Sequence, residues 1–485
     1  MEPLHDLTIK KFHEGLLSEE FSALEVTQAY FARIKEKDSE IGAYLSLAEK
    51  SALREAEAAD LAVAKDEPID DLAGVPLAVK DCILVKDLPA TAASKILEHY
   101  IASYDATAIK KLRAAGAVFL GKTNMDEFAM GGSTENSAFK ITRNPHDLER
   151  VPGGSSGGSA AAIAAHLAVA ALGSDTGGSI REPASFCGVV GLKPTYGAVS
   201  RSGLMAMTSS LDQIGPIAKT VEDAAIIFKT ISGQDPLDAT SVAAPYGESL
   251  THPDLQKIRE FTVGIPDEYF IEGISPEVSR AVESAMEKIK GLGLRLKKIS
   301  LPHTRYALST YYIIVPAEVS SNLARFDGIR YGGTMAPTER AKTNLSDLYL
   351  KTRGEGFGAE AKRRIILGTY VLSSGYYDAY YEKAQRVRQL IADDFKQAFE
   401  SVDVILTPVV PTPAFKIGER TADPLTMYLS DIFTIPVNLA GLPGISIPTK
   451  KNLAPHELPI NFQLIGKKWH EADILGIGQF YEKID

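Results

Sequence analysis

The sequence predicts an α/β fold built around a mostly parallel or mixed sheet. Short apolar runs typical of buried strands recur along the chain and alternate with segments of helical periodicity. The chain has 485 residues, of which 45% are hydrophobic, enough to bury a large core around a dry site. No internal repeat, low-complexity tract or Gly/Ser linker divides it, so we expect a single domain over residues 1–485.

The elements follow in order from the N-terminus. Apolar residues at three- and four-residue spacing predict helix from Leu24 to about Lys65. The run Val75–Val79 then predicts the start of a buried strand, and Thr107–Ala115 predicts an amphipathic helix with Gly116 as its C-terminal stop. Further strands are predicted at Ala117–Leu120, Val169–Leu172 and Val404–Leu406.

Composition excludes several classes of protein. The net charge is −10, from 52 basic and 62 acidic residues, and no dense Lys/Arg tract is present, so nucleic acid is not expected to be a main direct partner. Two cysteines, Cys82 and Cys187, without metal-ligand spacing argue against a disulfide framework or a metal site and fit a reducing cytoplasm. The longest apolar stretch, Ala160–Leu172, is too short to span a bilayer. We therefore expect a soluble protein of the cytoplasm, or of an organellar matrix, with no targeting segment.

Two clusters of glycine and serine are the most informative part of the chain. The first is Pro152–Ser159 and the second is Gly173–Ser179, and a predicted helix and strand separate them. Glycine lets backbone N–H groups approach a ligand closely, so the amides of Thr176, Gly177, Gly178 and Ser179 are candidates for an oxyanion hole. A single such cluster is as often an ordinary flexible turn, but two of them favour a site.

A serine nucleophile needs a base, and Lys80 is the better candidate than any histidine. His166, on the alanine-rich helix, is more often a packed or capping side chain. Lys80 follows the apolar run Val75–Val79, so burial would lower its pKa toward that of a general base. A lysine at a strand end is by itself usually a solvated residue, so its role depends on the combination.

That combination closely resembles the amidase signature family. The matching text is Gly74–Asp81, Pro152–Ser159 and Gly173–Arg181. The resemblance implies an amidase signature fold, a large mixed sheet covered by helices on both faces. It divides the chain into an N-terminal helical segment of about 1–65, a signature core of about 70–220 and a remainder that completes the pocket and the sheet.

The resemblance also implies the catalytic residues. The family uses a Ser–cis-Ser–Lys triad, and the matching positions are Ser179, Ser155 and Lys80. Ser179 is then the nucleophile of an acyl-enzyme mechanism. Ser155 follows a cis peptide bond and relays the proton between Ser179 and a neutral Lys80.

Within the family, the chain resembles the glutaminase subunits of tRNA-dependent amidotransferases. The segments that carry this resemblance are Ser320–Gly328, Glu355–Gly358, Ser373–Tyr381, Asp423–Tyr428 and Pro436–Gly444. Such a glutaminase frees ammonia from glutamine and needs no cofactor of its own. The ammonia passes to a tRNA-binding kinase/transamidase subunit, which uses ATP and Mg²⁺ to convert Glu-tRNA(Gln) to Gln-tRNA(Gln), and a small third subunit completes the complex. The tRNA is then an indirect partner.

A free amino acid needs a cation for its carboxylate and an anion for its ammonium. The resemblance assigns these roles to Arg364 and Asp431, with Tyr311 nearby. Arg364 could instead belong to a solvated helix face and Asp431 could be exposed, and Arg363 is the neighbouring alternative to Arg364.

Two positions depart from the usual family pattern. Glu182 stands where glutamine is common, and Cys82 stands where asparagine is frequent. A carboxylate at Glu182 would raise the pKa of Lys80, which puts the pH optimum in doubt. Neither change removes a triad member, so a non-catalytic scaffold is disfavoured. A free-standing amidase acting on another small amide is the main rival.

Two motifs point elsewhere. Gly116–Thr123 formally fits the phosphate-loop pattern GxxxxGK[ST], but its middle residues are predicted strand rather than open loop. Gly153–Gly157 fits the hydrolase pattern GxSxG, but the preceding Asn144–Arg150 is polar and contains Pro145, so the strand that this pattern requires is missing. We interpret both as coincidences.

Overall fold

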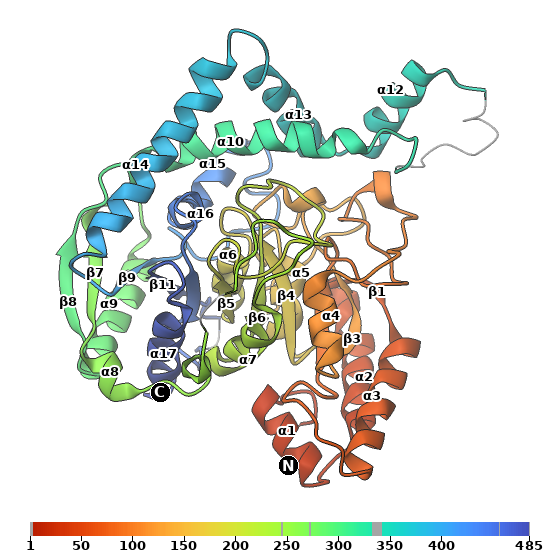
Figure 1. The fold of residues 1–485 in the computed structure, drawn as a ribbon, viewed down its shortest axis with the longest axis vertical. Coiled ribbons are helices and arrows are strands. Elements are labelled where there is room, and N and C mark those ends of the chain that lie inside the picture. Colours follow the sequence, from red (N-terminus) through yellow and green to blue (C-terminus); the bar gives the residue numbers. More distant parts are fainter. Residues whose placement is uncertain (1–2, 244–245, 271–272, 332–341, 455, 485) are drawn as a thin grey trace.

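The computed structural model describes residues 3–243, 246–270, 273–331, 342–454 and 456–484. Within these residues one sheet of eleven strands runs through the molecule in the order β1-β3-β2-β4-β6-β5-β10-β11-β9-β7-β8 (Figure 1). The strands are β1 (Tyr44–Leu47), β2 (Pro76–Lys80), β3 (Val118–Thr123), β4 (Ala170–Asp175), β5 (Val190–Lys193), β6 (Gln213–Ala218), β7 (Thr262–Pro266), β8 (Arg295–Ile299), β9 (Val404–Pro408), β10 (Gly444–Pro448) and β11 (Asn461–Gly466).

The sheet is mixed. Strand β2 runs parallel to both β3 and β4, and β7 runs parallel to β8 and β9, whereas the other neighbouring pairs are antiparallel. The predicted strands at 75–79, 117–120, 169–172 and 404–406 are confirmed as β2, β3, β4 and β9. Their residues are buried on both sides, which explains why they appear in the sequence as continuous apolar runs.

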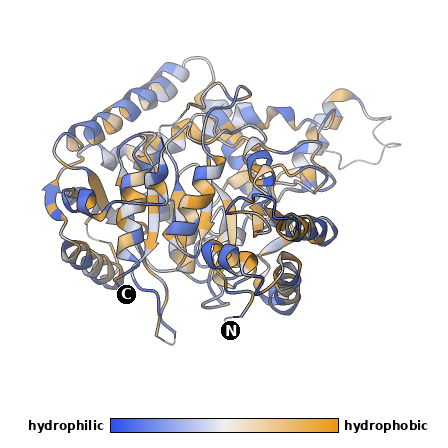
Figure 2. Ribbon diagram, turned by 60° about the horizontal axis from the view of Figure 1, so that its bottom comes forward, coloured by the Kyte–Doolittle hydropathy of each residue, from blue (hydrophilic) through white to orange (hydrophobic). Residues whose placement is uncertain are grey.

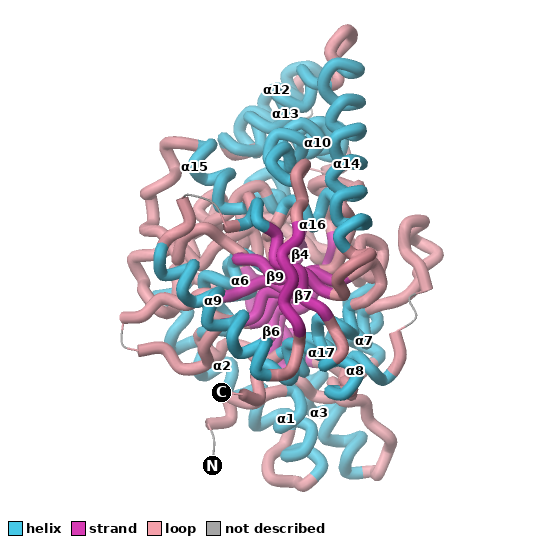
Figure 3. The backbone as a smooth tube through the Cα atoms, turned by 90° about the vertical axis from the view of Figure 1, so that its left-hand side faces the viewer, coloured by secondary structure: helices cyan, strands magenta, loops and turns pink. Residues whose placement is uncertain are grey.

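Helices cover both faces of the sheet, as predicted. Figure 3 shows α6 and α9 on one side of the strands and α7, α8 and α17 on the other. The α-helices are α1 (Ile9–Leu17), α2 (Ala23–Ile41), α3 (Glu49–Ala64), α4 (Thr107–Ala114), α5 (Gly157–Ala164), α6 (Arg181–Cys187), α7 (Val221–Ile231), α8 (Leu255–Arg259), α9 (Pro276–Gly291), α10 (Ala307–Asn322), α12 (Leu345–Gly356), α13 (Ala359–Val371), α14 (Lys383–Ala398), α15 (Pro424–Tyr428), α16 (Ile435–Leu439) and α17 (Glu471–Tyr481).

The N-terminal segment is less uniform than the sequence predicts. Helix α2 starts at a capping box made by Ser22 and Glu25 and ends at Gly42, whose φ of +73° is the left-handed conformation that glycine adopts most easily. The chain then forms β1, which pairs with β3 at the edge of the sheet, before α3 begins. The prediction of continuous helix from Leu24 to Lys65 is therefore wrong over residues 42–48. The spacing of apolar residues does not show that the chain leaves the helix at one glycine, Gly42.

Hydrophobic residues concentrate in the strands and on the inner faces of the helices (Figure 2). A further group of helices, α10, α13 and α14, lies beyond one end of the sheet (Figure 1). Among the described residues, no helix is both long and apolar enough to cross a bilayer. The end of the sheet below α10 and α13 is where β2 and β4 finish, and the candidate residues gather there.

Candidate functional site

The parallel pairing of β2 with β4 brings Lys80 to the start of the second glycine-rich loop. Leu77 pairs with Ala170 and Val79 with Leu172, so both strands end at the same edge. There the Lys80 Nζ forms hydrogen bonds with the hydroxyls of Ser155 at 2.7 Å, Ser156 at 2.8 Å and Ser174 at 2.9 Å. The lysine is thus completely buried and held by three serines rather than by a carboxylate.

Ser155 reaches Lys80 from the loop that precedes α5. The Gly154–Ser155 peptide bond is cis, as the resemblance implied. Ser155 is completely buried, and the next residue ties the two loops together, because the Ser156 N–H donates to the Ser179 carbonyl at 3.1 Å. The structure therefore brings the three predicted residues to one place, from two loops and a strand end.

Among these three residues, Ser179 is the one that lines a cavity. The cavity has a volume of about 140 Å³ and is closed by residues from α10, α13 and the segment around Asp431. In the described part of the chain, the backbone N–H groups of Gly177, Gly178 and Ser179 donate no hydrogen bond, so they remain available to an oxygen atom in the cavity.

Gly178 cannot be replaced by a larger residue in this conformation. Its φ is +152°, and a Cβ at this position would lie 2.4 Å from the Thr434 Oγ1 and 2.6 Å from the Asp431 Oδ1. The glycine therefore lets the loop that carries Ser179 pass directly beside Asp431.

Burial sets the charge state of the lysine. Removal from water lowers the pKa of Lys80, against the opposing effects of Cys82 and of the carboxylates of Asp126, Asp175 and Asp212. A lowered pKa favours the neutral amine that can act as a base. The sequence suggested that Glu182 would raise the pKa of Lys80, but Glu182 is not among the groups that shift this pKa most.

Asp175, the last residue of β4, is paired with an arginine. Burial raises the pKa of Asp175, but the charge of Arg181 and its hydrogen bonds outweigh burial and lower that pKa to about 2. Asp175 is therefore an ionised structural partner of Arg181, whose guanidinium also donates to Gln463 and Asn438.

The residues predicted for the amino-acid substrate line the same cavity. Tyr311 (from α10) and Arg364 (from α13) are both buried. Asp431, at the end of a 3-10 helix over Leu429–Asp431, has a buried Oδ1 without a hydrogen-bond partner among the described residues. Asp431 is therefore neither fully exposed nor satisfied, and Arg364 is not part of a solvated helix face.

Arg364, rather than Arg363, is the buried arginine. Its Nε donates to the Glu360 Oε1 at 2.8 Å, and its guanidinium lies beside the stacked rings of Tyr312 and Tyr428, 5.5 and 5.7 Å from their centres. Arg363 also lines the cavity and pairs with Glu360, but it is more exposed. A glutamate four residues before an arginine was the one sequence signal that could have identified Glu360. Nothing in the local sequence marks the two tyrosines.

The remaining sequence candidates lie elsewhere or act structurally. Gly121–Thr123 belongs to β3, and the Lys122 Nζ donates to the carbonyls of Asp81, Ile83 and Pro89, so no phosphate loop forms there. The sequence suggested that His166 lies on the alanine-rich helix, but α5 ends at Ala164, before this residue. The His166 Nδ1 contacts the Asp6 Oδ1 at 2.8 Å.

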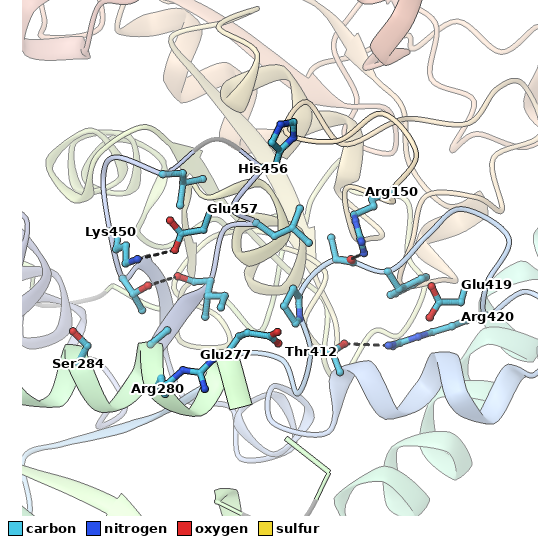
Figure 4. A pocket seen from close by; sticks show the side chains of 18 residues that line it. Arg150, Glu277, Arg280, Ser284, Thr412, Glu419, Arg420, Lys450, His456 and Glu457 are labelled. Carbon is cyan, nitrogen blue, oxygen red and sulfur yellow. Dashed lines mark hydrogen bonds and ion pairs between the residues drawn. The ribbon is translucent and has the colours of Figure 1, made fainter. Parts of the chain in front are cut away.

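A larger cavity of about 710 Å³ lies next to this site but holds none of the triad (Figure 4). It is an open groove between α9 and the loops around Thr412 and Lys450. Arg420 contributes to the walls of both cavities, with its guanidinium bound to Thr412 and Ser430. Among its charged residues, Lys450 pairs with Glu457.

Comparison with known proteins gives a consistent result. Residues 25–475 match the family model described as Amidase. The glutamyl-tRNA(Gln) amidotransferase A subunit from Carboxydothermus hydrogenoformans is 55% identical over 480 residues, which cover 99% of this chain and 97% of that protein.

Solved structures agree with this result. The crystal structure of the glutamyl-tRNA(Gln) amidotransferase A subunit from Thermotoga maritima aligns with a TM-score of 0.80 at 42% identity, covering 100% of this chain and 96% of the other. The peptide amidase from Stenotrophomonas maltophilia aligns with a TM-score of 0.81 at 25% identity, covering 99% and 97%. The likeness extends over the whole described sheet.

Proposed function

The chain belongs to the amidase signature family, and from this premise we propose that it is the glutamine-hydrolysing subunit of a glutamyl-tRNA(Gln) amidotransferase. The observation that carries the proposal is that a basic and an acidic side chain line the same small cavity as Ser179. One small cavity contains Ser179, a buried arginine, Arg364, and a carboxyl oxygen of Asp431 that has no partner among the described residues. A zwitterionic amino acid with a side-chain amide is complementary to these three groups.

We infer the chemistry from the hydrogen bond between Lys80 and Ser155 and from the place of Ser179 in the cavity. The Ser179 hydroxyl attacks the side-chain amide carbon of glutamine, and its proton passes to Ser155 while Ser155 gives its own proton to the neutral Lys80. The negative oxygen that forms is stabilised by the free N–H groups of Gly177, Gly178 and Ser179.

The same relay in reverse completes the reaction. Lys80 returns the proton through Ser155 to the leaving nitrogen, which departs as ammonia and leaves a γ-glutamyl ester on Ser179. Water, activated by the same base, then hydrolyses the ester to glutamate and restores Ser179. The net reaction is glutamine and water to glutamate and ammonia.

The ammonia is the useful product. We propose that it passes to a tRNA-binding kinase/transamidase subunit, which activates Glu-tRNA(Gln) with ATP and Mg²⁺ and completes the amide transfer, with a small third subunit in the same heterotrimer. Support comes from relatives at 55% identity that bear the name of this complex, and from the acidic charge of the chain, which leaves tRNA contact to a partner. Such a complex works in the cytoplasm.

A free-standing amidase is the second candidate, supported by the aligned peptide amidase. The two differ in their need for the charged ends of the substrate. The test compares hydrolysis of glutamine with that of a neutral primary amide of similar length. An amidotransferase glutaminase prefers glutamine strongly and loses this preference in Asp431→Asn. A chain that hydrolyses both amides equally well would be a general amidase.

A further inference from the structure

Two carboxyl side chains at the wall of the cavity have oxygen atoms without a hydrogen-bond partner in the described part of the chain. Glu182, in the first turn of α6, is completely buried. Its Oε2 accepts one long hydrogen bond of 3.4 Å from the Gly154 N–H, and its Oε1 accepts none. The Oδ1 of Asp431 is equally without a partner.

A glycine lies against each of the two carboxyl groups. A Cβ on Gly132, which lines the cavity, would lie 3.3 Å from the Glu182 Oε2 and 3.5 Å from its Oε1. A Cβ on Gly178 would lie 2.6 Å from the Asp431 Oδ1. Glu182 therefore sits directly behind the lining, while Asp431 is part of it.

The charges that face Glu182 leave it without a cation of its own. Asp431 and Asp126 repel a negative charge there, whereas Arg420 favours one. The guanidinium of Arg420 donates to the Ser430 hydroxyl at 2.7 Å and to the Thr412 hydroxyl at 3.1 Å rather than to Glu182.

Asp431 faces two arginines, each already bound to another carboxylate. Arg181 is paired with Asp175 at 2.9 Å and Arg364 with Glu360 at 2.8 Å. Both arginines favour a charge on Asp431, whereas burial, Asp175 and Asp126 oppose it, so that its pKa rises to about 8. Burial and the charge of Asp431 raise the pKa of Glu182 well above its usual range.

Two ionised carboxylates in this place would leave two buried charges, of which a bound α-ammonium can neutralise only one. We propose that Glu182 keeps its proton throughout, so that Asp431 alone takes the negative charge that holds the substrate. Glu182 is thereby a positioning residue. This inference rests on the proposed function, because it requires a substrate with an α-ammonium group.

The proposal specifies where each proton goes. In the empty pocket at pH 7 both carboxyl groups are protonated. When glutamine binds, Asp431 releases its proton to solvent and pairs with the α-ammonium, while the proton on Glu182 stays. No other group changes charge.

Infrared spectroscopy of protonated carboxyl groups tests this directly. The Ser179→Ala variant binds glutamine without turnover, and in it we expect one carbonyl band that Glu182→Gln removes and a second that Asp431→Asn removes. Glutamine should abolish only the second. Absence of the Glu182 band at pH 7, or its loss on glutamine binding, would overturn the proposal. Failure to bind glutamine with the Glu182 band still present would instead count against the proposed function.

Kinetics supply a second test in the active chain. Ionisation of Glu182 beside the nucleophile loop should oppose the oxyanion and lower kcat at alkaline pH. In Glu182→Gln, the ratio of kcat at pH 9 to kcat at pH 7 should rise by about threefold or more. Glu127→Gln is the matched control, since Glu127 is also buried, with its pKa raised to about 7 mainly by burial, but it binds Ser94 and Gly358. A uniform loss of kcat without a change in profile would mean that Glu182 is only structural.

Discussion

The Lys80 Nζ lies 2.7 Å from the Ser155 Oγ, and both side chains are completely buried. Ser179 lines the cavity, whereas neither of the other two does. In the proposed mechanism the proton of Ser179 reaches the lysine through Ser155, which contacts Lys80 directly.

Removing either member of the relay should slow hydrolysis to a similar degree. Lys80→Met and Ser155→Ala are each expected to lower kcat/KM for glutamine by about 10²–10⁴, and the double variant by little more than the larger single loss. Steady-state ammonia release measures all three. A double variant whose loss equals the product of the single losses would show that the two residues act independently.

The lowered pKa of Lys80 predicts the acid side of the pH profile. The neutral amine is the active base, so kcat/KM should rise with pH through this pKa and be lost below it. The midpoint should lie below the ordinary lysine value of 10.5. Lys122→Met is the control, because Lys122 is equally buried on β3 but donates to carbonyls. If the midpoint moved in that variant, or lay at the ordinary value, Lys80 would not be the titrating base.

Arg364 should bind the substrate carboxylate through its planar guanidinium. Arg364→Lys is expected to raise the KM for glutamine about 10- to 100-fold, since altering a buried charged pair typically removes a few kcal/mol. Arg363→Lys on the next position of α13 is the matched comparison and should change KM by only about threefold or less. Equal effects of the two variants would remove the assignment of Arg364 as the carboxylate ligand.

The sequence predicted the triad of the candidate site better than the pocket around Arg364. Ser155, Ser179 and the free amides lie in contiguous glycine- and serine-rich segments, and Lys80 ends a short apolar run, so all three triad positions could be found by resemblance. The pocket is different, because Tyr312, Glu360 and Tyr428 come from distant helices and only packing brings them around Arg364. Local patterns do not carry such contacts.

The fold shows the same limit. Buried parallel strands such as β2 and β4 are continuous apolar runs and were predicted within a few residues. The edge strand β1 was not, since its four residues lie inside text of helical periodicity and become a strand by pairing with β3. Glu182 was noted as a departure, but its burial and missing hydrogen bonds depend on the packing around α6.

A buried carboxyl group far from the site should make stability depend on pH. Asp223 accepts a hydrogen bond from the Ile9 N–H, and burial raises its pKa from 3.8 to about 7. The folded state therefore holds a proton that the unfolded state releases, so this contribution to stability is present at low pH and lost as pH rises through about 7.

Asp223→Asn removes that titration. The free energy of unfolding of this variant, relative to the native chain, should increase between pH 5 and pH 9 by about 3 kcal/mol. Urea denaturation at several pH values measures the difference. A difference that is independent of pH would mean that Asp223 is ionised in the folded chain throughout this range.

The covalent intermediate tests the central claim most directly. The chain is mixed with glutamine, quenched in acid within the first turnovers, digested and analysed by mass spectrometry. The account predicts a γ-glutamyl ester on the peptide that contains Ser179, absent in Ser179→Ala, which should lose about six orders of magnitude in rate. A glutamyl group on another residue, or substantial glutamine hydrolysis by pure Ser179→Ala, would contradict it.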